Sequence, residues 1–110
     1  MPSYQEIDAV QLHAMLHGET PPLLVDVRSC DEVAKGMLAG ARHIPLSSLE
    51  SRAADLEGNA PLVFYCHSGI RSGQACSFML HHGRANVFNL RGGILAWGMA
   101  NYPILPYLQE

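Results

Sequence analysis

Charged residues are scarce in this sequence. They make up 15% of its 110 residues, with seven Lys or Arg against ten Asp or Glu and a formal net charge of −3. The charges are spread without blocks, whereas nucleic-acid binding needs a concentrated basic surface, so that class of partner is not expected. Long hydrophobic runs are also missing. The longest, residues 62–66, has five residues, and a bilayer-spanning helix needs roughly twenty, so no membrane span is expected.

Cysteine is sparse and irregularly spaced. The three cysteines, Cys30, Cys66 and Cys76, are odd in number and form no C-x-x-C pair. A disulfide framework or a structural zinc site is therefore not expected, and a reducing compartment with at least one free thiol fits better. The first ten residues contain neither a basic segment nor an apolar one of the signal-peptide kind, so we expect a cytoplasmic location.

Apolar segments alternate between strand-like and helix-like patterns along the chain. Strands are expected to end at Ile7 and to span 23–27, 62–65 and 86–90. Helices are expected over 9–17, from Ser29 or Asp31 to near Gly36, and over 49–56, 71–82 and 94–99, with loop or short extended structure over 37–48. This order predicts a single α/β domain with a central, mostly parallel sheet covered by helices on both faces.

The segment with the clearest chemistry follows the most apolar strand. Cys66 comes directly after residues 62–65, at the strand end where parallel sheets bind ligands. A loop wrapped around Cys66 would aim backbone N–H groups and a helix N-terminus at its sulfur, favouring the thiolate. Gly69 permits positive φ, Arg71 can fork onto an oxyanion, and Ser72 can cap the helix or donate to the same anion. The alternative is a buried cysteine before an ordinary turn.

Four motifs in order resemble the rhodanese-like sulfurtransferases. Residues 66–72 match the family's Cys-x-x-Gly-x-Arg-Ser loop, 24–28 its Asp-Val-Arg strand end, 40–45 its Gly-Ala-x-x-Ile-Pro segment, and 90–97 its Gly-Gly-x-x-x-Trp signature. The resemblance runs from about residue 4 to 99, leaving a short tail over 100–110, and implies one rhodanese-like domain over 1–110. Met37 and Ala39 replace the family's usual His and Pro, so no function is carried onto Met37.

The resemblance implies a double displacement through Cys66. Its thiolate would take the outer sulfur of an anionic donor such as thiosulfate, forming a cysteine persulfide. Cyanide, a cellular thiol or a protein thiol would then remove that sulfur. No metal or organic cofactor is implied. The residues expected to bind substrate are the rest of the loop: His67, Ser68, Gly69, Ile70, Arg71 and Ser72.

Two other functions compete with sulfur transfer. Cysteine phosphatases and arsenate reductases of the same fold have a Cys-x5-Arg loop, whereas four residues separate Cys66 from Arg71 here. The shorter loop favours a sulfur donor. A non-catalytic regulatory or sulfur-relay module is the second alternative, and the presence of Cys66 within its loop argues against it.

The remaining reactive side chains are expected to be mainly structural. Asp26 and Arg28 are expected to form a buried ion pair, Cys76 to pack in the core, and Trp97 to anchor the last helix. A redox role for Cys30 is the less favoured alternative to a structural one. The histidines are expected to be structural at 13, 17 and 43, to end a helix at 81 and 82, and to lie at the loop rim at 67.

Overall fold

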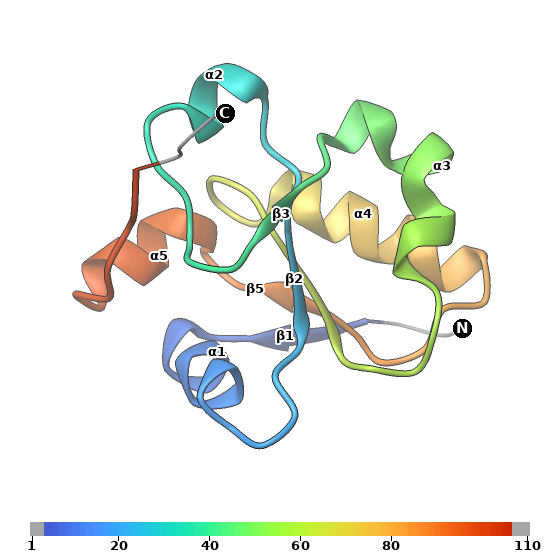
Figure 1. Ribbon diagram of the computed structural model, residues 1–110, viewed down its shortest axis with the longest axis horizontal. Coiled ribbons are helices and arrows are strands. Elements are labelled where there is room, and N and C mark those ends of the chain that lie inside the picture. The colour runs from blue at the N-terminus through green and yellow to red at the C-terminus, as the bar shows by residue number, and fades with distance from the viewer. Residues whose placement is uncertain (1–3, 107–110) are drawn as a thin grey trace.

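A five-stranded sheet forms the centre of the protein, whose computed structural model describes residues 4–106 (Figure 1). The spatial order of the strands is β1-β5-β4-β2-β3, and every pairing between them is parallel. The strands are β1 (Gln5–Ile7), β2 (Leu23–Asp26), β3 (Arg42–His43), β4 (Leu62–Tyr65) and β5 (Val87–Leu90). The predicted α/β fold with a parallel sheet is thereby confirmed, and β4 lies at its centre.

Helices cover both faces of the sheet, as the sequence predicted. They are α1 (Ala9–Leu16), α2 (Cys30–Val33), α3 (Leu49–Arg52), α4 (Ile70–His81) and α5 (Gly93–Met99). Capping boxes start two of them: Asp8 exchanges hydrogen bonds with Gln11 at α1, and Ser29 does so with Glu32 at α2. None of the helices within residues 4–106 has the length and apolar character needed to cross a bilayer.

The side chains of β4 show how one strand supplies two cores. Leu62 and Phe64 join the cluster that α3 and α4 cover, whereas Val63 and Tyr65 join the cluster formed with α1 and α5. This alternation follows the two-residue period of a strand. All four residues are fully buried, and together they form a continuous apolar run. Packing on both faces of the sheet therefore holds the end of β4 in place.

Several element boundaries differ from the predictions, and three of the differences fall within residues 46–70. The helix expected over 49–56 is α3 followed by a 3₁₀ turn at Ala53–Leu56, and residues 46–48 form another 3₁₀ turn where loop or extended structure was expected. Such turns commonly finish or precede short helices. The helix expected from residue 71 begins at Ile70, because Gly69 takes the N-cap position with φ of 110°.

The chain after α5 folds back onto the domain. Trp97 is buried and its Nε1–H donates to the carbonyl of Pro103 at 2.9 Å. Leu105 forms an isolated antiparallel bridge with Met37, and the two backbone hydrogen bonds between them are each 2.9 Å long. Trp97 therefore anchors the last helix, as expected, and it also fixes the segment that follows.

Candidate active site

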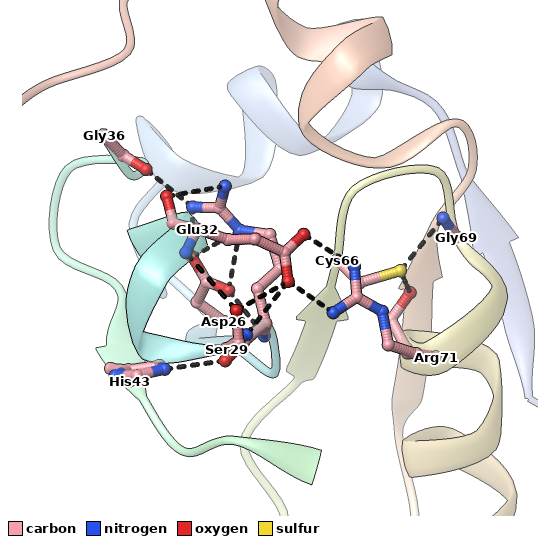
Figure 2. A network of polar contacts seen from close by, with 10 residues as sticks. Asp26, Ser29, Glu32, Gly36, His43, Cys66, Gly69 and Arg71 are labelled. Atoms are coloured by element: carbon pink, nitrogen blue, oxygen red, sulfur yellow. Dashed lines mark hydrogen bonds and ion pairs between the residues drawn. The ribbon is translucent and has the colours of Figure 1, made fainter. Parts of the chain in front are cut away.

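Cys66 lies at the carboxyl end of the central strand. β4 ends at Tyr65 and α4 begins at Ile70, so the intervening residues turn from the sheet into the helix (Figure 2). Cys66 is 1% exposed, while His67 and Ser68 are exposed at the rim of the loop. The sequence placed a thiol at this edge of a parallel sheet, and the structure has it there.

The thiol sulfur is surrounded by hydrogen-bond donors. The backbone N–H of Gly69 donates to Sγ at 3.1 Å, and the Ser72 hydroxyl donates to it at 3.3 Å. Burial opposes ionisation of Cys66, but donation from Ser72 and from the backbone of Ser72, Gly69 and Ser68 outweighs it and lowers the pKa of this thiol. Ser72 is fully buried, so its hydroxyl serves the sulfur and does not cap α4.

The outer side of the loop is held by α5. The backbone N–H of Ile94 donates to the carbonyl of Cys66 at 2.9 Å, and that of Leu95 donates to the carbonyl of His67 at 3.2 Å. Gly93 has φ of 60°, and a Cβ there would fall on the carbonyl oxygens of Cys66 and His67. This close approach explains why the second residue of the Gly-Gly-x-x-x-Trp pattern, the first residue of α5, is glycine.

Asn89 is a site residue that the sequence analysis missed. It is 2% exposed on β5, and its Nδ2 donates to the Gly69 carbonyl at 3.1 Å and to Glu6 Oε2 at 2.8 Å. The bond to Gly69 fixes the peptide next to the one that donates to Sγ. An amide within a buried strand is the signal that could have identified this residue.

Arg71 is engaged by an acidic residue from another element. Its NH1 and NH2 donate to the two carboxylate oxygens of Glu32 on α2, at 2.6 and 2.8 Å (Figure 2). Hydrogen bonding from Arg71 is the main reason that the pKa of Glu32 is lowered to about 2. A bound oxyanion would have to share these nitrogens or displace the carboxylate. The forked contact between Arg71 and substrate stays a prediction.

The expected ion pair between Asp26 and Arg28 is confirmed. Arg28 NH2 lies 2.7 Å from Asp26 Oδ2, and both side chains are buried. The same NH2 group donates to the Gly36 carbonyl at 2.6 Å, and the backbone N–H of Leu38 donates to the Tyr65 hydroxyl at 3.0 Å. The bond from Arg28 attaches the segment after α2 to the residues that follow β2, and the bond to Tyr65 attaches it to the end of β4.

The other two thiols have different surroundings. Cys76 is buried in α4, its Sγ donates to the Phe88 carbonyl at 3.4 Å, and burial raises its pKa. Cys30 is exposed at the start of α2. Within residues 4–106, no group of three or more His, Cys, Asp or Glu side chains is arranged to hold a metal ion. Cys66 thus differs from the other two thiols in the hydrogen-bond donors that surround its sulfur.

Comparisons with known proteins identify the family of this chain. Residues 8–100 match the model of the rhodanese-like domain. A sulfurtransferase of Allochromatium vinosum is 39% identical over 91% of this chain and 94% of its own length. The thiosulfate sulfurtransferase GlpE of Stutzerimonas stutzeri is 30% identical over 88% of this chain and 87% of its own length. The crystal structure of a rhodanese-related protein from Thermoplasma volcanium has a TM-score of 0.85 and 29% identity, covering 94% of this chain and 100% of that one. The chain therefore belongs to the rhodanese-like domain family.

Proposed function

We propose that this protein is a sulfurtransferase that carries sulfane sulfur as a persulfide on Cys66. The observation behind the proposal is the buried sulfur that accepts hydrogen bonds from Gly69 and Ser72. Such donors favour a thiolate, which is the nucleophilic form of cysteine. Cys66 is only 1% exposed, and this restricts attack to a small terminal atom such as the outer sulfur of a donor.

The first step transfers sulfur to the enzyme. With thiosulfate, the Cys66 thiolate attacks the outer sulfur, a new S–S bond forms, and the donor S–S bond breaks with its electron pair leaving on sulfite. No proton needs to move, because the thiolate and the dianion become a persulfide anion and a sulfite dianion. The donors around Sγ would also stabilise the persulfide anion. The name of the Stutzerimonas stutzeri relative, a thiosulfate sulfurtransferase, supports this donor.

The second step regenerates the thiolate. A thiophile attacks the outer sulfur of the persulfide and leaves with it, so that cyanide yields thiocyanate and a thiol yields a new persulfide. We propose that a small thiol or a protein thiol is the cellular acceptor, and that the compartment is the reducing cytoplasm, where Cys66 stays a thiol between turnovers. The substrate contacts would come from the backbone of the loop and from the rim side chains His67, Ser68, Ile70 and Arg71.

Intact-mass spectrometry tests this proposal directly. After incubation with thiosulfate, the protein should gain the mass of one sulfur atom and lose it on addition of cyanide. Cys66→Ser should gain nothing, because a serine hydroxyl without a base is a poor nucleophile, whereas Cys30→Ser should behave like the wild type. A mass gain that survives in folded Cys66→Ser, or that disappears in Cys30→Ser, would show that the nucleophile is misassigned.

A further inference from the structure

A buried amide stands in the sheet where an apolar side chain would be usual. Asn89 lies on β5 and is 2% exposed, and its partners in the parallel register are Glu6 on β1 and Phe64 on β4. Register partners in a parallel pair point to the same face, and Phe64 belongs to the apolar cluster that α3 and α4 cover. The side chain of Asn89 therefore lies between this core and the edge strand β1.

The amide nitrogen of Asn89 serves two acceptors. Nδ2 donates to Glu6 Oε2 at 2.8 Å and to the carbonyl of Gly69 at 3.1 Å. An amide carries two N–H groups, so each acceptor can receive one of them. These bonds fix the orientation of the amide, because the opposite orientation would place its oxygen against a carboxylate and a carbonyl.

This orientation leaves the amide oxygen without a partner. Oδ1 of Asn89 is buried, and no donor within residues 4–106 forms a hydrogen bond with it. A buried acceptor without a donor destabilises a fold, so its presence calls for an explanation. A valine would suit a strand and would bring no such atom into the core. The bonds made by the nitrogen, and not the stability of the sheet, therefore account for an asparagine at this position.

The carbonyl that Asn89 holds belongs to the residue that donates to the catalytic sulfur. Gly69 donates its N–H to Cys66 Sγ at 3.1 Å, and its φ of 110° and ψ of −4° set the direction of that N–H relative to its own carbonyl. The carbonyl also accepts from the N–H of Gly73 at 3.1 Å, as the first bond of α4. Donors from α4 and from β5 thus hold Gly69 together.

We propose that Asn89 is a positioning residue for sulfur transfer and that Glu6 orients its amide. Asn89 acts through Gly69, whose N–H it keeps directed at the sulfur. Donors that are fixed in advance stabilise an anion better than donors that must first turn towards it. The inference rests on the proposed function, but the reactivity of the thiol can be measured without any sulfur donor.

The test is Asn89→Val, which removes both the donor and the unsatisfied oxygen. Its thermal stability should equal or exceed that of the wild type, because Glu6 is exposed to water and the Gly69 carbonyl keeps its bond from Gly73. At pH values below the pKa of Cys66, alkylation by iodoacetamide should slow about three- to tenfold, the factor that corresponds to one ordinary hydrogen bond. The rates should converge at high pH. At the lower pH values, kcat/KM for sulfur transfer from thiosulfate to cyanide should fall by a similar factor.

Glu6 provides a second set of variants, because its side chain is exposed and its truncation leaves the core intact. Glu6→Ala removes the acceptor that orients the amide, so it should slow alkylation in the same pH range by a smaller factor. Glu6→Gln keeps an acceptor oxygen and should retain the wild-type rate. Two controls should leave the pH profile unchanged: Gln5→Ala, at an exposed residue of the same strand, and Phe88→Leu, which alters packing on the other face of β5.

An alkylation profile of Asn89→Val that coincides with the wild type would overturn the inference. So would a rate reduced equally at all pH values, since that indicates a blocked sulfur. If Asn89→Val does not fold and Glu6→Ala matches the wild type, Asn89 is a structural residue only and the inference fails. If the wild type takes no sulfur from thiosulfate, the proposed function fails instead, and the alkylation profiles still decide whether Asn89 positions the donor.

Discussion

The hydroxyl of Ser72 offers the sharpest test of the thiolate site. Ser72→Ala removes the donor that lies 3.3 Å from Cys66 Sγ and leaves the backbone donors in place. A hydrogen bond to a charged group contributes about 1.5–3 kcal/mol. We expect the lower end, because the contact to sulfur is long and because Gly69 still donates at 3.1 Å. About 1.4 kcal/mol corresponds to a tenfold change in ionisation.

The sign of the effect follows from which form the hydroxyl stabilises. Without it the pKa of Cys66 rises, so at pH values below both pKa values the thiolate fraction and the alkylation rate should fall about tenfold. At pH values above both, the two rates should converge.

The assay is the rate of modification by iodoacetamide across pH, followed on the Cys66 peptide, since an uncharged reagent reports the thiolate alone. Ser77→Ala, an exposed serine of the same helix, is the matched control and should match the wild type at every pH. A Ser72→Ala rate that equals the wild type throughout would refute the reasoning. So would a rate reduced by the same factor at all pH values, because that would indicate altered access to the sulfur.

Three further changes probe the surroundings of the loop. Glu32→Gln removes the carboxylate that holds Arg71, so kcat/KM for thiosulfate should rise relative to that for the monoanionic donor benzenethiosulfonate, and more at low salt; a ratio independent of salt would contradict this. The ion pair between Arg71 and Glu32 should also make the stability of the wild type depend on pH. As the pH falls from about 5 towards the pKa of about 2 for Glu32, the free energy of unfolding should fall by about 1 kcal/mol, a value reduced to allow for the solvent exposure of the pair. Urea titrations of wild type and Glu32→Gln at both ends measure it, and equal losses in the two proteins would assign the acid sensitivity elsewhere. Gly93→Ala should lower the free energy of unfolding by about 2 kcal/mol or more and slow the alkylation of Cys66. Gly40→Ala, also at positive φ but with open space around it, should lower that free energy less. Equal losses in the two variants would exclude the contact between Gly93 and the loop.

Local chemistry made much of the fold predictable. The strand at 62–65 is wholly apolar, and the capping residues Asp8 and Ser29 mark helix starts, so the order of elements follows from neighbouring residues. The exact path of residues 46–56 does not follow from neighbouring residues. The hydrogen bonds of α and 3₁₀ turns differ by one residue in their spacing, and packing selects between the two. A two-residue strand such as Arg42–His43 has too short a pattern to recognise, since only its neighbour β2 defines it.

The candidate site also has a part that could be predicted from the sequence and a part that could not. The position of Cys66, the positive φ of Gly69 and the donors around the sulfur follow from a strand, a turn and a helix that adjoin in sequence. Partners from elsewhere in the chain could not be found by spacing. Glu32 lies 39 residues before Arg71, and Asn89 lies 20 residues after Gly69. In the structure Glu32 completes a capping box with Ser29, but that local pattern says nothing about its second partner, Arg71.

The bonds around the loop also explain why its donors face the sulfur. When the N–H groups of a tight loop point inward, its carbonyls point outward and need donors of their own. The first N–H groups of a helix lack partners within that helix, and those of Ile94 and Leu95 donate to the carbonyls of Cys66 and His67. One set of contacts thus satisfies both the start of α5 and the outside of the loop, and fixes the donors before any substrate arrives. A substitution that shifts α5 away from β4 should therefore raise the pKa of Cys66 before it unfolds the protein.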